Sequence, residues 1–369
     1  MPLTINDLRR FALARSLFPP TTLAKAIAKL GFVQADPIRA PARAQDLTLR
    51  QRVKNYRAGD LERRYAALPI EEDFFVNYGF VPRATQALMH PRTPRTAWPK
   101  ARATQAGAVL DFVREHGVVH PREVDAHFAH GKVKNWFGGS SRASTQLLDE
   151  MHYQGLLRIA ARDAGVRTYP AREAQAPTLD ADAALDALID VIVRKYAPLP
   201  ARSLAALVGH LRGGTPQWVD RHRVALSRAK SRLPQANVEG LDWYWPAGEN
   251  PGSKRHAVPD DMLDEVRLLA PFDPLVWDRH RFELFWGWAY RFEAYTPSAK
   301  RKLGYYALPL LWRERVIGWG NLSVASGKLV AEMGYVAGRA PREAAFRHAL
   351  QAELERLKLF LDLAGSDST

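Results

Sequence analysis

Apolar residues near the N-terminus recur at helical spacing. Leu8, Phe11 and their apolar neighbours predict an amphipathic helix over residues 4–18. Thr4 or Asn6 can cap this helix, because a short polar side chain accepts a hydrogen bond from the free N–H groups of the first turn. The chain is therefore expected to open with a capped helix that buries one face.

A second amphipathic run over residues 21–30 meets a glycine at Gly31, which is typical of a helix C-terminus. Gln34 and Asp36 then lie just beyond the helix end, and Pro37 fixes the backbone that follows. The pattern predicts that both polar side chains stand on a short, stiff connection.

Helix, helix, helix and hairpin follow one another within residues 101–172. A turn at Gly117 separates the first two helices, His120 precedes the second, and Ser140 or Ser141 is expected to cap the third. This order is typical of a winged helix. Four polar side chains near the start of the third helix are the expected groove contacts: Arg142, Ser144, Thr145 and Gln146.

Short apolar and aromatic runs separated by turn residues replace the helical pattern after Val266. Alternation within residues 291–295 and 304–312 predicts a small antiparallel sheet or barrel. A final amphipathic run over residues 341–365 predicts a closing helix. We therefore expect an α+β, mainly helical chain with tandem winged-helix (helix-turn-helix) units and a C-terminal small β-barrel. The expected modules are 1–100, 101–172, 173–250 and 251–369.

The charge adds a functional class to this picture. The 369 residues include 53 Lys and Arg against 39 Asp and Glu, a net charge of +14. Such an excess favours a polyanionic partner, most often nucleic acid, although a merely solvated basic surface is the alternative. The absence of cysteine excludes disulfides and thiolate sites. Because no run of 18 apolar residues occurs, we expect a soluble, cytoplasmic protein without membrane contact.

Most chemical motifs are absent or weak. No G-x-S-x-G elbow, P-loop or G-x-G-x-x-G is present, which argues against serine hydrolases, P-loop NTPases and dinucleotide enzymes. Asp125, His127 and His130 could share a helix face, but solvation or capping explains them better than a metal does. We expect no cofactor and no metal.

The segment Gln34-Ala35-Asp36 is the most specific candidate. In an extended backbone, residues two apart point the same way, so the amide and the carboxylate could hold one water. An aspartate before proline is, however, commonly a turn-former. Taken alone, the tripeptide leaves both interpretations open.

Four segments carry a wider resemblance: GFVQADPIRAPARAQ, LERRYAALPIEEDFFVNYGFVPRATQALMHPR, LLAPFDPLVWDR and YRFEAYTPSAKRKLGYYALPLLW. Together they resemble the bacterial AlkZ/YcaQ-like DNA glycosylases, also described as winged-helix DNA-binding proteins. The resemblance implies three winged-helix units and a β-barrel around a DNA channel. It also implies a catalytic tripeptide of Gln, an apolar residue, then Gln or Asp, which Gln34-Ala35-Asp36 matches in its Asp form.

The resemblance further implies a monofunctional DNA glycosylase, active in base excision repair of alkylated, N7-substituted purines and of interstrand crosslinks. Asp36 would stabilise the oxocarbenium-like sugar and activate water, and Gln34 would position that water. A monomer acting on double-stranded DNA is expected, with neighbouring cations holding the pKa of Asp36 low. The candidate DNA-contacting residues are Arg39, Arg43, Arg50, Arg52, Arg83, Arg92, Arg95, Arg142, Thr145, Gln146, Lys300 and Arg301.

Two departures from the family pattern stand out. Ala35 is smaller than the usual apolar residue, and Phe80 stands where the family often has a histidine. The alternative function is a non-enzymatic winged-helix transcriptional regulator, for which the tripeptide is only a turn. A structural or RNA-binding protein is a third hypothesis.

Overall fold

The chain forms two compact units. A computed structural model describes residues 2–93, 97–129, 131–134, 140–163, 165–173, 179–253 and 264–363. The first unit combines Met1–Leu61, Ile189–Leu207 and Leu226–Thr369, and the second combines Glu62–Leu188 and Val208–Ala225. Among the described helices, none is long and apolar enough to cross a bilayer.

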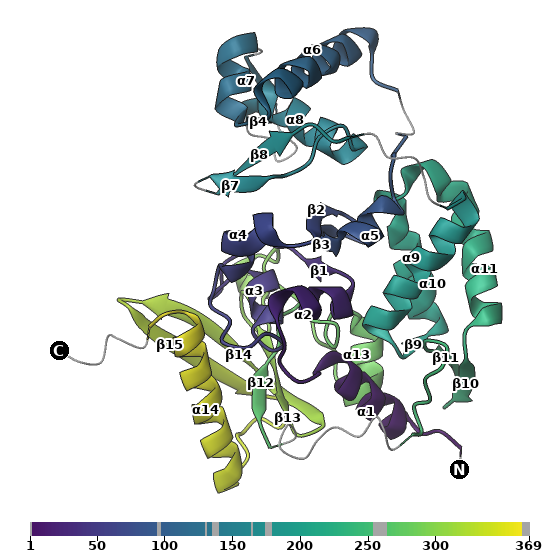
Figure 1. The fold of residues 1–369 in the computed structure, drawn as a ribbon. Coiled ribbons are helices and arrows are strands. Elements are labelled where there is room, and N and C mark those ends of the chain that lie inside the picture. Colours follow the sequence, from purple (N-terminus) through teal and green to yellow (C-terminus); the bar gives the residue numbers. More distant parts are fainter. Residues whose placement is uncertain are drawn as a thin grey trace. The chain divides into compact units, whose positions relative to one another are not determined.

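The first unit opens with two helices whose ends follow from local chemistry (Figure 1). Helix α1 (Ile5–Ser16) begins at a reciprocal cap, in which Thr4 Oγ1 accepts from the Asp7 amide and the Asp7 carboxylate accepts from the Thr4 amide. Helix α2 (Leu23–Leu30) ends at Gly31, which has a φ of 67°. A Cβ at Gly31 would lie 2.7 Å from Val191 Cγ1, and the positive φ adds backbone strain, so both features favour glycine there. Both predicted helices are confirmed.

The C-terminal part of the first unit is a four-stranded antiparallel sheet curled into a half-barrel, in the order β12–β13–β14–β15. Helix α14 (Ala344–Phe360) packs against β12 (Figure 1), where the Leu268 amide donates to Glu353 Oε1 at 2.9 Å. The expected antiparallel sheet and closing helix are therefore present. The strands are β12 (Val266–Leu268), β13 (Leu308–Trp312), β14 (Arg315–Ala325) and β15 (Lys328–Tyr335).

The strand expected over residues 291–295 is wrong. These residues form no strand, because the buried Glu293 carboxylate accepts the backbone amides of Lys302 and Leu303 at 2.8 and 2.7 Å and folds the segment into a turn. The aromatic residues that precede this segment lie partly in helix α13 (Arg279–Trp286). Asp278 caps this helix by accepting from the Arg281 amide.

The first unit also contains several short elements, and four helices have residues in both units. The short elements are β1 (Val33–Gln34), α3 (Ala44–Leu49), β9 (Leu199–Pro200), β10 (Gln235–Val238), β11 (Leu241–Tyr244) and η5 (Ser298–Lys300). The helices with residues in both units are α4 (Asp60–Arg64), α9 (Ala181–Tyr196), α10 (Ala201–His210) and α11 (His222–Arg232).

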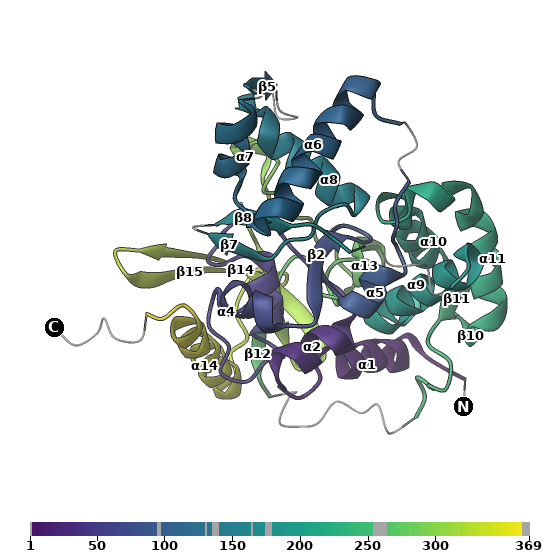
Figure 2. The same ribbon diagram turned by 45° about the horizontal axis from the view of Figure 1, so that its top comes forward.

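The second unit includes helices α6, α7 and α8 with strands β7 and β8 (Figure 2), and its three-stranded sheet has the order β4–β8–β7. The elements are α6 (Lys100–His116), β4 (Val118–Val119), α7 (Pro121–Phe128), β5 (Lys132–Lys134), β6 (Ser140–Arg142), α8 (Ala143–Gln154), β7 (Ala161–Asp163) and β8 (Val166–Pro170). The predicted cap of α8 is wrong. Ser140 and Ser141 lie in β6, which pairs with β5. Arg142 is therefore the N-cap residue, and it makes no side-chain capping bond.

The segment over residues 74–110, which contains no acidic residue, includes several short regular elements. It contains part of β2 (Ile70–Phe74), then β3 (Tyr78–Pro82) and α5 (Arg83–Ala87), before the chain reaches α6. The short 3-10 helices of the second unit are η1 (Tyr65–Ala67), η2 (Leu211–Gly213) and η3 (Pro216–Arg221).

Candidate active site

Gln34 is the last residue of β1, and Asp36 follows it by two positions in the first unit. Their residues are 6% and 8% exposed. Gln34 Oε1 accepts a hydrogen bond from Trp277 Nε1 at 2.8 Å, and the Trp277 ring packs on Tyr196. A tryptophan far along the chain therefore fixes the orientation of the candidate amide.

Two hydrogen bonds involve Asp36 among the described residues. Its amide donates to Gln45 Oε1 on α3 at 3.2 Å, and its Oδ1 accepts from the Ile38 amide at 2.9 Å. The second bond closes an Asx turn, which is the local role expected of an aspartate before proline. Oδ2 accepts no hydrogen bond from the described residues, so one carboxylate oxygen keeps its lone pairs available.

Burial raises the pKa of Asp36 above its usual range, and the hydrogen bond from Ile38 opposes that shift only in part. The expectation that arginines hold this pKa low is therefore wrong. The physical reason is desolvation: the carboxylate loses water, and no ion pair compensates among the described residues. A desolvated carboxylate is a stronger base than an exposed one, as general-base chemistry requires.

Two tyrosines near Asp36 were not identified from the sequence. Burial, and after it the negative charge of Asp36, raises the pKa of both Tyr295 and Tyr306. Tyr295 is 77% exposed, whereas Tyr306 is buried and packs edge-on against Phe292, with ring centroids 5.1 Å apart. Both hydroxyls stay protonated at neutral pH and can act as donors.

Arg52 and Arg50 are structural residues rather than exposed cations. Arg52 is fully buried and makes a bidentate ion pair with Asp273 at 2.7 and 3.0 Å. The Arg50 side chain is 5% exposed and pairs with Glu353. Since neither guanidinium reaches solvent freely, both are withdrawn from the set of candidate phosphate contacts.

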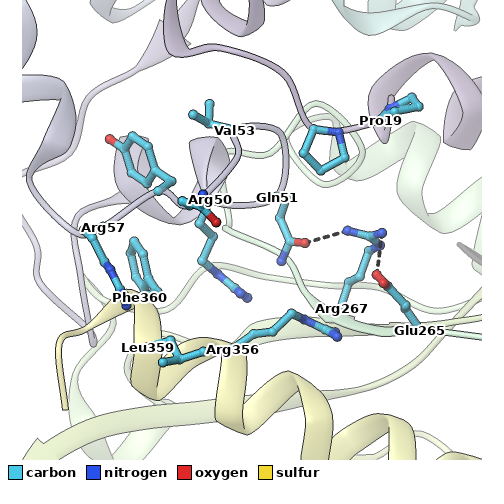
Figure 3. Close-up of a pocket in the computed structure, with 13 residues that line it drawn as sticks. Pro19, Arg50, Gln51, Val53, Arg57, Glu265, Arg267, Arg356, Leu359 and Phe360 are labelled. Atoms are coloured by element: carbon cyan, nitrogen blue, oxygen red, sulfur yellow. Dashed lines mark hydrogen bonds and ion pairs between the residues drawn. The ribbon is translucent and has the colours of Figure 1, made fainter. Parts of the chain in front are cut away.

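A cationic cavity of about 480 Å³ lies at the C-terminal end of α3, lined by Arg50 and by Arg57 (Figure 3). Gln51 Oε1 accepts from Arg267 at 3.0 Å, and Arg267 also pairs with Glu265 at 2.6 Å. Neither Gln34 nor Asp36 lines this cavity, so it is separate from the candidate catalytic pair.

The other candidates of the first unit are exposed or half-buried. Arg39 is exposed three residues after Asp36, and Arg43 is half-buried at the start of α3. Lys300 is exposed, and the Arg301 guanidinium lies 5.0 Å from the centre of the Tyr305 ring.

The candidates of the second unit divide in the same way. Arg92 is wrong as a phosphate contact, because it is buried and donates to Asp73 at 2.7 Å and to the Gly214 carbonyl at 2.7 Å. Arg83 is exposed and pairs with Glu71 at 3.0 Å. Arg95 lies outside the described residues.

The start of α8 brings three candidates together. Arg142 and Gln146 are exposed and Thr145 is half-exposed, whereas Ser144 is fully buried and is not available for groove contacts. Arg142 also pairs with Asp125. Only part of the predicted surface of this helix is therefore accessible.

Neither departure from the family pattern introduces a polar side chain. Phe80 is 2% exposed and packs edge-on against Tyr65, with ring centroids 6.1 Å apart. Ala35 is half-buried between the two candidate residues.

His127 packs on Phe112 at a centroid distance of 4.7 Å, and His130 lies outside the described residues. In the described part of the chain, no three potential His, Cys, Asp or Glu ligands cluster as a metal would need.

A buried lysine, Lys195, contacts the backbone directly before β1. Lys195 donates to the carbonyl of Phe32, and burial, reinforced by the charge of Arg52, lowers its pKa to about 7. The unfolded chain holds this proton to about pH 10.4, so the unfolded state binds more protons between the two values. Stability should therefore rise as the pH rises from about 7 to 10.

Replacing Lys195 by methionine should remove this rise, which amounts to at most about 1.4 kcal/mol per pH unit. Urea unfolding of the wild type and of Lys195→Met at pH 7 and pH 9 measures the difference. The exposed Lys25→Met variant is the control and should keep the wild-type slope. Equal slopes in the wild type and Lys195→Met would contradict the assignment.

Comparison with known proteins now adds the family. The family model described as DNA glycosylase AlkZ-like matches residues 27–360. The structure is similar to that of the Streptomyces sahachiroi DNA glycosylase AlkZ, with a TM-score of 0.60 at 13% sequence identity. That similarity covers 98% of this chain and 97% of the other, and at this identity it indicates a shared fold. The family match spans the candidate pair, the half-barrel and all of α14, and the chain belongs to the AlkZ-like DNA glycosylase family.

Proposed function

We propose that this protein is a monofunctional DNA glycosylase that hydrolyses the N-glycosidic bond of alkylated, N7-substituted purines in double-stranded DNA. One observation carries the proposal: Asp36 is a desolvated carboxylate whose Oδ2 has no partner among the described residues, two positions after Gln34. The same two residues match the family's catalytic tripeptide. Purines in interstrand crosslinks are a further substrate class within this proposal.

The chemistry needs a charge, a water and a base. An N7-alkylated purine is cationic, so the bond between C1′ and N9 breaks with its electron pair leaving on the purine. Asp36 stabilises the positive charge that develops on the sugar, and its Oδ2 takes a proton from the water that attacks C1′. Gln34 holds that water through its amide nitrogen, because Trp277 already occupies the amide oxygen.

Replacing Trp277 by phenylalanine should lower the rate of base release about fivefold, with little change in KM. The loss corresponds to one neutral hydrogen bond of about 1 kcal/mol, without which the Gln34 amide is free to rotate. Single-turnover release of 7-methylguanine measures the rate. Trp286→Phe is the matched control, since the Trp286 indole donates to the Glu314 carbonyl instead; a rate equal to wild type in Trp277→Phe would contradict the role.

DNA binding is proposed for surfaces of both units. The order β4–β8–β7 beside α6, α7 and α8 supports a winged helix at 101–172, and we retain 1–100, 173–250 and 251–369 as the other modules. The net charge of +14 supports a polyanionic partner. A monomer in the cytoplasm is part of the proposal. The retained contact residues are Arg39, Arg43, Arg83, Arg142, Thr145, Gln146, Lys300 and Arg301.

Incubation of the purified protein with duplex DNA containing 7-methylguanine tests the proposal. The free base should appear in solution, and the strand should break at the lesion only after treatment with alkali. Strand breaks without alkali would contradict the monofunctional assignment, and absence of released base would contradict the glycosylase assignment.

A second candidate function is a non-enzymatic DNA-binding regulator. It is favoured by the Asx turn, in which Asp36 Oδ1 accepts from the Ile38 amide and so has a structural role. This candidate predicts sequence-specific duplex binding without base release. Selection of bound sequences from a random duplex pool, beside the release assay, separates the two functions.

A further inference from the structure

A second cavity, of about 580 Å³, lies in the first unit beside the segment that carries Asp36. Its volume falls in the range of roughly 300–1,000 Å³ that is usual for small-molecule sites. The lining residues come from three places: residues 39–41, residues 304–306, and the paired strands β14 and β15. Residues 39–41 follow Asp36 by three to five positions, and the negative charge of Asp36 raises the pKa of the lining residue Tyr306, so the cavity lies near Asp36.

Two side chains that line this cavity bury polar atoms without partners. Tyr306 is 2% exposed, and its hydroxyl accepts and donates no hydrogen bond within the described chain. Asn321 donates from Nδ2 to the Leu303 carbonyl at 2.7 Å, which leaves its buried Oδ1 as an unused acceptor. Buried polar groups are almost always satisfied by a protein group, a ligand or ordered water, and both of these residues line the cavity.

The remaining walls combine apolar side chains with three polar ones, Arg39, Ser323 and Glu332. Leu322, Val324 and Val330 supply aliphatic surface, and the half-exposed Tyr305 supplies an aromatic ring. Aromatic rings stack on nucleobases, because every base has a π-face. One donor, one acceptor and a stacking wall form a complementary environment for the edge and face of a heteroaromatic base.

We propose that this cavity binds the damaged purine base, with the Tyr306 hydroxyl donating to its carbonyl oxygen and Asn321 Oδ1 accepting from a ring N–H. Alkylation of guanine at N7 leaves both groups available, since O6 still accepts and N1–H still donates. Enzymes that act on a base read its Watson–Crick edge in this way once it leaves the stack. The inference rests on the proposed glycosylase function and deepens it by naming a guanine base as the ligand of the cavity.

Binding of free 7-methylguanine to the full-length protein tests the proposal without any need for catalysis. Ligand-detected NMR and calorimetry should find saturable binding to the wild type. In Tyr306→Phe the Kd should rise about threefold to tenfold, as loss of one neutral hydrogen bond implies. The melting temperature of that variant should stay equal or rise, because an unsatisfied hydroxyl is removed.

Tyr290→Phe is the matched control. The buried Tyr290 hydroxyl donates to the Ala307 carbonyl at 2.8 Å and does not line the cavity, so its loss should lower the melting temperature and leave base affinity unchanged. A second variant, Val330→Trp, fills the cavity from an exposed position on β15 and should abolish base binding.

Failure of the cavity assignment and failure of the glycosylase function give different results. Base release from DNA, combined with wild-type base affinity in both Tyr306→Phe and Val330→Trp, would overturn the cavity assignment alone. Absence of release, combined with base binding that both variants weaken, would overturn the function and leave the cavity as a base-binding site. No saturable binding of 7-methylguanine to the wild type would also overturn the inference.

Discussion

Replacing Asp36 by asparagine should lower the rate of 7-methylguanine release at least about 100-fold, the lower end of what general acid–base catalysis contributes. Asparagine has nearly the same shape and keeps an oxygen that accepts from the Ile38 amide, so the turn after β1 is preserved. Only the negative charge and the basic oxygen are lost. Affinity for undamaged duplex DNA should stay within about twofold, because phosphate contacts dominate that affinity.

The pH profile distinguishes the catalytic role from a structural one. Burial raises the pKa of Asp36, so wild-type release should rise with pH along a limb that lies above the ordinary aspartate value. This limb should be absent from the residual activity of Asp36→Asn. The exposed Asp242→Asn variant is the control and should keep both the rate and the limb. Wild-type release by Asp36→Asn would falsify the role.

The stability of Asp36→Asn should not fall with its activity. A carboxyl group whose folded pKa is raised contributes stability at low pH that is lost as the pH rises through the folded pKa. At neutral pH the charged Asp36 therefore destabilises the folded state. Asp36→Asn should melt at an equal or higher temperature than the wild type. Such a gain in stability with a loss of activity is characteristic of a functional residue.

Local signals in the sequence predicted the helix ends where one residue decides the geometry. Thr4 accepts from an amide in the first turn, and Gly31 adopts the left-handed conformation that other residues avoid. The prediction failed at Ser140 and Ser141, whose hydroxyls suit a cap equally well. The pairing of β6 with β5 overrides that preference, and strand pairing cannot be read from a short window.

The candidate site shows the same division between local and distant information. Gln34 and Asp36 were identified from a tripeptide and its family context. Trp277 lies 243 positions from Gln34 in the sequence, and Tyr306, which senses the charge of Asp36, lies two residues before β13. No spacing rule connects such positions, because only the folded chain brings them to β1.

Charge counting predicted the partner class but misassigned individual arginines. Arg52 and Arg92 were counted as surface cations, yet each is buried beside an aspartate in the core of its unit. Composition reports how many charges a chain carries and not which ones are desolvated. The carboxylate that pairs with each of these two arginines lies far away in sequence or on another element.

Replacing Arg52 by alanine should lower the free energy of unfolding by about 3–5 kcal/mol, the usual effect of removing one partner of a buried ion pair. Arg52 donates to the Ser16 carbonyl at the end of α1 at 2.7 Å, to the Thr48 carbonyl of α3 at 2.8 Å, and to both oxygens of Asp273. Its loss leaves the Asp273 carboxylate charged and unpaired in a fully buried position. Urea unfolding followed by tryptophan fluorescence measures the effect.

A double variant and an exposed pair test the cause of this loss. Arg52→Met combined with Asp273→Asn removes both charges, so it should be more stable than Arg52→Ala, because no lone buried charge remains. Arg10→Ala breaks the exposed pair with Glu314, in which the arginine side chain is 55% exposed, and should change stability by less than about 1 kcal/mol. A loss in Arg52→Ala no greater than that of Arg10→Ala would show that the Asp273 charge is compensated by other groups. The three segments around Arg52 would then be held together by apolar packing instead of by this ion pair.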